Sequence, residues 1–363
     1  MYYASALATR SFLAVVLFAA LNLGIIFIFQ PFTISGDSVS YFETARLLYG
    51  ETDTAMHPNR ILKPLGPYSA ALLGDLFGVG VERGLIIENG LFYILIIPMI
   101  YLALLMLSQD QRSAMWGSIL YLSSFPLLRH GIAYMTDFSG WFFTAAVIFL
   151  VVLWHDSRFL RYALAAGVTA AIGLLFKEYV VAGGLFFGIL LLVHAKERPF
   201  SAFKAALWFG VPFLLIAGSW QVYSYTVYNA SYLDWYRTGG VGRYMLGDIP
   251  FMLKSMVAVF LAGWVLAIRG ARMLWREGSA RDKLLAASLI PGSLSFLVWH
   301  VASSRIYFVS GVLLAWLAGI SATHLYGRKR WTAIFAVSLV IAVNYIWFII
   351  GDKARPFFWP WIQ

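Results

Sequence analysis

The segment ISGDSVSYFETARLLYG, residues 34–50, is the first polar stretch of the chain and follows its first long apolar run. If Ser35 or Asp37 caps a helix here, an apolar face forms at helical spacing, with Ser40, Glu43 and Thr44 on the opposite side. Such a helix lies in the plane of a membrane surface rather than across it, and holds the Asp37 carboxylate at the membrane boundary. Alternatively, Asp37 only accepts a backbone N–H as a helix cap. The apolar face would consist of Tyr41, Phe42, Ala45, Leu48 and Tyr49.

The composition indicates a protein with many membrane spans. Of the 363 residues, 61% are hydrophobic and 12% are charged, whereas soluble proteins have roughly 25% charged residues. The chain has no cysteine, which excludes disulfides, thiolate metal sites and cysteine nucleophiles. The formal net charge of +10 is compatible with binding to nucleic acid. The basic residues lie in connections between apolar runs, however, which indicates that they set the membrane topology instead. We therefore predict an all-α polytopic membrane protein, a single integral membrane domain over residues 1–363, with membrane lipids and no nucleic acid as partners.

Apolar runs of roughly 20 residues predict about eleven transmembrane helices. Two connections between them are long: a first external loop, residues 31–83, with interfacial helices, and a second external loop, residues 228–250. The predicted spans lie near residues 11–30, 84–107, 113–128, 138–154, 162–176, 179–194, 205–227, 251–268, 284–301, 306–325 and 331–350.

Arginine and lysine gather in the short connections on one side of these spans. The positive-inside rule makes that side cytoplasmic, so both long loops face outward. Short loops and the lack of cysteine favour a bacterial plasma (inner) membrane, with the outward side in the periplasm. The basic residues assigned to the inner side are Arg10, Arg112, Arg158, Arg161, Lys196, Arg198, Lys204, Arg269, Arg272, Arg276, Arg281, Lys283, Arg328, Lys329 and Arg330.

Ionisable residues at membrane depth are costly and indicate function. The first group joins Asp37 to the proline-rich segment HPNRILKPLGPY, residues 57–68, which includes His57. Its prolines make a stiff connection. Arg60 and Lys63, three residues apart, could face one anion together, or contact lipid headgroups at the interface.

The second group is Arg129-His130 with Thr136-Asp137. Asp137 begins the fourth predicted span, so it either interacts with the helix N-terminus or is a second carboxylate facing Asp37. In that position it would bind a sugar hydroxyl, a basic side chain or a metal.

The third group is Lys177-Glu178, between two spans with almost no loop. Glu178 either neutralises Lys177 or Arg305, or leaves Lys177 to bind a phosphate as a point charge. Arg305, which lies between His300 and Tyr307, offers a bidentate fork to the same anion. His300 is alternatively a structural, hydrogen-bonded histidine.

A divalent cation, Mg²⁺ or Mn²⁺, could bind Asp37 together with Asp137 or Glu178, although spacing alone leaves the metal unknown.

Four segments together resemble the GT-C superfamily of membrane glycosyltransferases. GDSVSYFETARLLYG (36–50), followed by HPNRILKPLGPY, is similar to the first external loop of that superfamily. The other three are similar to helices of the protein O-mannosyltransferases and lipid A aminoarabinose transferases, and we expect this chain to be without the large soluble domains of those enzymes. These three are TDFSGWFFTAAVIFLVVLW (136–154), GLLFKEYVVAGGLFFGILLL (173–192) and SSRIYFVSGVLLAWLAGI (303–320).

The resemblance implies a transferase that takes a sugar from a polyprenyl-phosphate-linked donor on the external face of the membrane. Its acceptor is a glycan, a lipid or a protein. By the same resemblance, Asp37 is the catalytic base, Asp137 a second acidic residue, and Lys177 and Arg305 hold the carrier phosphate. Further candidates for substrate binding are Tyr41, His57, Arg60, Lys63, Arg129, His130, Glu178, His300 and Tyr307.

Two other classes fit parts of the pattern. A secondary transporter or a flippase for lipids or lipid-linked sugars would use buried charges as a pathway, and would need them near the midplane. Glu88 alone lies well inside a predicted span. A structural subunit without chemistry would have no need of a long, proline-rich first loop.

Overall fold

The computed structural model describes residues 7, 9–30, 32–51, 53–238, 249–298 and 303–358. Every regular element in these ranges is a helix, which confirms the all-α prediction. The α-helices are α2 (Arg10–Phe29), α3 (Gly36–Leu48), α4 (Pro58–Ile61), α5 (Leu65–Leu76), α6 (Gly80–Ser108), α7 (Gln111–Leu122), α8 (Phe125–His130), α9 (Asp137–Ser157), α10 (Leu160–Phe176), α11 (Val181–Glu197), α12 (Pro199–Phe213), α13 (Ser219–Tyr228), α14 (Tyr232–Thr238), α15 (Ile249–Phe260), α16 (Gly263–Glu277), α17 (Ala280–Ser293), α18 (Ser304–Tyr307), α19 (Gly311–Arg328) and α20 (Arg330–Phe358).

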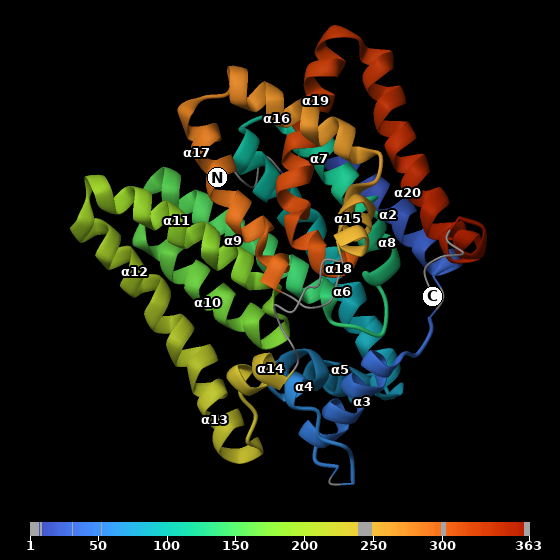
Figure 1. Cartoon of the computed structure of the whole chain (residues 1–363), viewed down its shortest axis with the longest axis vertical. Coiled ribbons are helices and arrows are strands. Elements are labelled where there is room, and N and C mark those ends of the chain that lie inside the picture. Colours follow the sequence, from blue (N-terminus) through green and yellow to red (C-terminus); the bar gives the residue numbers. More distant parts are fainter. Residues whose placement is uncertain are drawn as a thin grey trace.

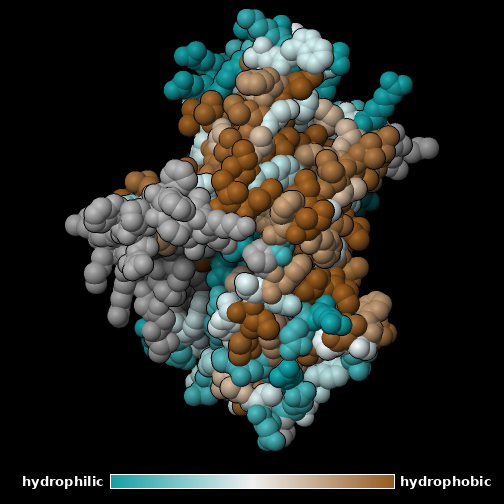
Figure 2. Space-filling model, turned by 90° about the vertical axis from the view of Figure 1, so that its right-hand side faces the viewer, coloured by the Kyte–Doolittle hydropathy of each residue, from teal (hydrophilic) through white to brown (hydrophobic). Residues whose placement is uncertain are grey.

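The long helices form one bundle, with α3, α4, α5 and α14 gathered at one end (Figure 1). On the face drawn in Figure 2, hydrophobic residues cover most of the middle, and hydrophilic residues gather at both ends. The turns between α16 and α17 and between α19 and α20, which carry many of the basic residues, lie at the end opposite α3 (Figure 1). The chain is therefore a multi-pass membrane protein with two chemically different ends.

The count of eleven spans is not confirmed. Within the described ranges, seven helices are long and apolar enough to cross a membrane, or eight if a bent pair counts as one span. That pair is α15 and α16, which meet at 83° where residues 251–268 were predicted as one helix. The predicted span 113–128 is likewise divided into α7 and α8 at Ser123 and Ser124. Of the predicted second external loop, residues 239–248 lie outside the described residues.

The helix predicted in the first loop is present as α3. Ser35 is its cap: the Ser35 hydroxyl accepts from the Ser38 N–H, and the Ser38 hydroxyl accepts from the Ser35 N–H. Asp37 sits in the first turn instead of capping the helix, so its carboxylate is available for other contacts.

The predicted faces of α3 are only partly right. Tyr41, Phe42 and Ala45 are buried as expected, but Ser40 and Thr44 are buried as well, and Tyr49 is exposed. Ser40 and Thr44 lie inside because their hydroxyls have partners: Thr44 donates to the Ser40 carbonyl, and Ser40 to that of Asp37. A polar residue with a local partner can be buried at small cost.

The first loop is attached to the bundle by close packing of α5 against α6. Gly84 on α6 lies so near α5 that a Cβ there would collide with the carbonyl oxygen of Ala70 and approach the Gly74 nitrogen to 2.7 Å. Close approach of the two backbones therefore requires glycine at this position.

We predict that Gly84→Ala destabilises the protein by about 1–3 kcal/mol, because the added methyl group overpacks the contact between α5 and α6. Gly90→Ala is the matched control, since Gly90 lies on the same helix with open space around its Cβ position. Thermal unfolding in detergent measures both variants. Equal stability of the two would show that this contact does not hold the loop.

Candidate active site

Asp37 is held by two arginines that are far apart in the sequence. The Nη2 atom of Arg60, on α4, lies 2.8 Å from Asp37 Oδ1, and the Nη2 atom of Arg305, on α18, lies 2.7 Å from Oδ2. Arg60 is fixed in turn by α3, since it donates to the Ser40 hydroxyl at 2.9 Å and its guanidinium stacks 4.0 Å from the centre of the Tyr41 ring. The Asp37 carboxylate thus joins the first loop to the late helix α18.

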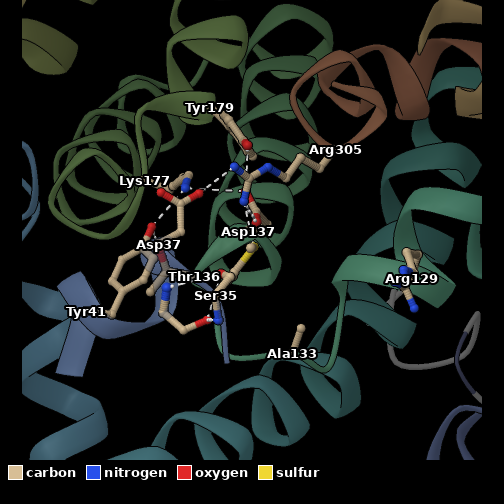
Figure 3. Close-up of polar contacts among 12 residues, drawn as sticks. Ser35, Asp37, Tyr41, Arg129, Ala133, Thr136, Asp137, Lys177, Tyr179 and Arg305 are labelled. Carbon is tan, nitrogen blue, oxygen red and sulfur yellow. Dashed lines mark hydrogen bonds and ion pairs between the residues drawn. The ribbon is translucent and has the colours of Figure 1, made fainter. Parts of the chain in front are cut away.

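Asp137 is the second carboxylate of the site. It begins α9 and is fully buried, with Oδ1 at 3.3 Å from Lys177 Nζ and Oδ2 at 3.5 Å from Arg305 Nη1. The Tyr179 hydroxyl also donates to Oδ1. Arg305 therefore bridges Asp137 and Asp37 (Figure 3).

Tyr41 closes this arrangement into a ring. Its hydroxyl accepts hydrogen bonds from Arg60 Nη1 at 2.9 Å and from Lys177 Nζ at 3.0 Å. A continuous circuit of six side chains results, which we term the charge ring. Its members, in order around the circuit, are Asp37, Arg60, Tyr41, Lys177, Asp137 and Arg305.

The break between α10 and α11 directs Lys177 into the charge ring. Helix α10 ends at Phe176, and Lys177 has extended backbone angles before the short 3₁₀ turn Glu178–Val180. Gly140 on α9 permits the approach, because a Cβ there would lie 2.8 Å from Lys177 Cβ and 2.9 Å from the Tyr179 ring. A break in the helix, rather than a loop, thus brings the lysine to Asp137.

The segment before α9 is fixed by an amide on α6. The Asn89 side chain donates to the carbonyl oxygens of Ala133 and Met135, at 2.7 and 2.8 Å. Thr136, which follows, has its hydroxyl 2.9 Å from the Tyr41 oxygen. Asp137 therefore enters the site on a fixed backbone.

The two carboxylates differ in access to solvent. The Asp37 side chain is 43% exposed, whereas that of Asp137 is 0% exposed. Burial alone would raise the pKa of Asp37, but the hydrogen bond from Arg305 and the charges of Arg60, Arg305 and Lys177 hold it below its ordinary value. Asp37 is therefore ionised at neutral pH, and is a weak base while both arginines hold it.

The charge ring has a surplus of positive charge, since two carboxylates face three cations. Burial would raise the pKa of Tyr41, but the charges of Arg60 and Lys177 outweigh it and lower the pKa of this phenol. Burial would lower the pKa of Lys177, yet Asp137 and Tyr41 raise it, so the lysine keeps its proton. A surplus cation at the edge of a buried network favours an anionic ligand.

Other predicted residues pair outside the charge ring. Lys63 binds Glu178 at 2.8 Å, and both side chains are buried. Glu178 thus forms its direct ion pair with Lys63 rather than with Lys177 or Arg305, and Arg60 and Lys63 each bind a carboxylate of their own. His57 pairs with Glu43 in a half-exposed position of the first loop.

The remaining candidates lie further away. Arg129 points away from the charge ring (Figure 3), and its carbonyl accepts from Gln30 at 2.9 Å. His130 packs edge-on against Phe125, and Tyr307 is buried in a stack with Phe296. His300 lies outside the described residues.

Glu88 does not face a charge among the described residues. It is buried between α5 and α6, where the Ser69 hydroxyl donates to it at 2.6 Å. Glu88 thus contributes a hydrogen bond to the packing of α5 against α6, which attaches the first loop to the bundle.

Three residues of the site were not predicted as functional: Ser40, Tyr179 and Asn89. Tyr179 directly follows Lys177-Glu178, so its position in the break was a usable signal. Ser40 was assigned to the wrong face of α3. For Asn89, no local sequence feature indicates that an asparagine within an apolar helix donates hydrogen bonds to a distant backbone segment.

The charge ring does not fit a divalent cation as it stands. Both carboxylates are already bound by arginine or lysine, and no group of three or more His, Asp or Glu side chains converges within the part of the chain that the structure describes. We therefore derive no step through a metal.

Solved structures share this architecture. ArnT from Cupriavidus metallidurans matches with a TM-score of 0.66 in its apo state and 0.63 bound to undecaprenyl phosphate, at 19% and 17% identity. The chain has the GT-C fold. The oligosaccharyltransferase AglB from Archaeoglobus fulgidus, in complex with an inhibitory peptide and a dolichol-phosphate, matches with a TM-score of 0.58 at 12% identity. The resemblance predicted from the sequence is thus confirmed at the level of the fold.

In sequence, residues 56–222 match the family model of dolichyl-phosphate-mannose-protein mannosyltransferases. That segment holds Arg60, Asp137 and Lys177, but neither Asp37 nor Arg305. No curated protein matches the chain. The structural matches cover 94% of this chain and 65% of ligand-bound ArnT, and 95% of this chain and 56% of AglB.

We predict that Tyr41→Phe destabilises the protein by about 1.5–3 kcal/mol, because two charged donors lose their shared buried acceptor. Tyr68→Phe is the control, since Tyr68 also lies in the first loop but is half-exposed, with no hydrogen bond to its hydroxyl in the described residues. Thermal unfolding in detergent measures the difference. If both variants unfold at the wild-type temperature, the Tyr41 oxygen does not hold the charge ring together.

Proposed function

We propose that the protein is an integral membrane glycosyltransferase that moves a sugar from a polyprenyl-phosphate-linked donor to a glycan, lipid or protein acceptor. The observation that carries the proposal is the charge ring, in which a single arginine contacts both an accessible carboxylate and a buried one. The family match over residues 56–222 and the ligands of the similar structures, undecaprenyl phosphate and dolichol-phosphate, support the lipid-linked donor.

In this proposal Asp37 is the general base. It is the more accessible carboxylate, so an acceptor hydroxyl can reach it, and general-base catalysis contributes about 10²–10⁴-fold. The acceptor oxygen gives its proton to Asp37 and forms the new bond to the anomeric carbon. The bond from that carbon to the phosphate oxygen breaks, and polyprenyl phosphate leaves.

Lys177 and Arg305 stabilise the departing phosphate. Fixed cations in a poorly hydrated site stabilise developing negative charge more strongly than water does. Asp137 orients both cations and, being fully buried, is not placed to attack the sugar. A single displacement with inversion at the anomeric carbon follows from one base and no carboxylate nucleophile.

We predict that purified wild type consumes a radiolabelled polyprenyl-phosphate sugar by transfer or hydrolysis, and that Asp37→Asn lowers the rate by at least about 100-fold. Asp75→Asn is the control, because Asp75 is an exposed first-loop carboxylate that pairs with Tyr49. The anomeric configuration of the product is read in the same assay. Full activity of a folded Asp37→Asn variant would show that Asp37 is not the general base. A product of retained configuration would exclude the single displacement.

The proposed active site faces outward, to the periplasm if the membrane is a bacterial inner membrane. The support is the concentration of basic residues at the opposite end of the bundle. The connection between α3 and α4 and the end of α16 lie toward opposite ends of the bundle (Figure 1). Asp53 belongs to the first and Glu277 to the second, and both residues are exposed.

The chain lacks cysteine, so one introduced thiol reports its own location. We predict that the thiol of Asp53→Cys reacts with a membrane-impermeant maleimide on intact cells, and that of Glu277→Cys only after permeabilisation. The reverse pattern would place the site on the cytoplasmic side.

A further inference from the structure

Arg305 makes the longest contact of the charge ring and is the most exposed of its three cations. Its contact with Asp137 is long, at 3.5 Å, whereas its contact with Asp37 is a 2.7 Å hydrogen bond. Its side chain is 18% exposed, while those of Lys177 and Arg60 are 6% and 7% exposed. An anion that approaches from the first-loop side can therefore reach Arg305 more easily than the other two cations.

The N–H groups of Arg305 that face the site are already in use. Nη2 donates to Asp37, and Nη1 lies near Asp137 Oδ2 and 2.6 Å from the Met135 sulfur. A phosphate that binds Arg305 in a bidentate manner needs these same two nitrogens. The carboxylate and the phosphate therefore compete.

We propose that the carrier phosphate displaces Asp37 from Arg305, and that this exchange frees Asp37 Oδ2 to take the proton of the acceptor. The proposal rests on the transferase function proposed above and adds an order of events to it. The base becomes available only after the donor has bound.

Burial decides which carboxylate leaves. Asp137 has no exposed surface, and moving it away from its cations would leave an unpaired charge in the interior, which is strongly unfavourable. Asp37 is 43% exposed and can turn toward water. Arg60 stays in place because it also donates to Ser40 and Tyr41, so Asp37 keeps one partner on Oδ1.

The exchange also changes Asp37 as a base. The hydrogen bond and charge of Arg305 contribute to the low pKa of this carboxyl. When the phosphate neutralises Arg305, that contribution is lost and the proton affinity of Asp37 rises. Without a donor, Asp37 remains paired and activates water poorly.

Competition predicts that removal of the carboxylate tightens phosphate binding. A ligand binds more weakly when its site is occupied by an internal competitor for most of the time. We expect Asp37→Asn to bind undecaprenyl phosphate about fivefold to tenfold more tightly than wild type, the gain being limited by the exposure of Asp37. Titration of the full chain in nanodiscs of zwitterionic lipid measures both dissociation constants.

Loss of a negative charge attracts any anion, so the test needs a second background. In the Arg305→Gln variant, Asp37 and the phosphate no longer compete for an arginine. Adding Asp37→Asn to this variant should therefore change the dissociation constant for undecaprenyl phosphate less than twofold. Asp75→Asn, which removes a charge from the same loop away from the charge ring, should leave it unchanged. Inorganic phosphate, titrated in parallel, shows whether the phosphate group alone drives the exchange, and tighter binding of it by Asp37→Asn is the expected result.

The two proposals fail in different ways. If Asp37→Asn abolishes transfer but binds undecaprenyl phosphate no more tightly than wild type, the exchange is wrong and the transferase stands. An equal gain in the Arg305→Gln background also overturns the exchange, because simple charge attraction then explains it. If wild type neither binds a polyprenyl phosphate nor consumes any donor, both proposals fall.

Discussion

The fully buried carboxylate of Asp137 is the constraint on which the site depends. An ion without access to water is tolerated only when cations and hydrogen-bond donors surround it. Here they come from two parts of the chain: Lys177 and Tyr179 at the break between α10 and α11, and Arg305 on α18. The bundle can bury Asp137 only if it also brings these parts together, so the charge of Asp137 constrains the packing of the helices as well as the chemistry of the site.

The first loop adds the accessible half of the site to this buried half. Helix α3 supplies Asp37 and Tyr41, and α4 supplies Arg60, so the loop contributes three of the six members of the charge ring. Tyr41 lies against Lys177 and Asp37 against Arg305, and the loop is thus fixed to the bundle by polar contacts as well as by the packing of α5 on α6. One carboxylate contacts cations in the interior, while the other is partly open to solvent.

The exposure of the two carboxylates separates their roles. Both belong to ion pairs, and both lie within reach of Arg305. Only Asp37 can leave its arginine without stranding a charge in the interior, so only Asp37 can alternate between a paired and a free state. In the proposed exchange, this difference in exposure allows the occupancy of Arg305 to control Asp37 as a base.

Sequence alone determined the class of the protein, the polar helix after the first span and the break at Lys177, and it predicted Asp37 and Asp137 as residues of the site. These features follow from hydropathy, capping residues and the cost of charge in lipid, which are local properties of the chain. The tertiary structure alone decided which cation binds which carboxylate. Arg305 is 268 residues from Asp37, and Lys63 reaches Glu178 rather than the anion of Arg60, because such pairings depend on where helices cross. The same reason explains why the sequence did not predict the divided spans or the buried side of Ser40: helix ends, bends and buried hydroxyls are fixed by their neighbours in space, which spacing along the chain does not encode.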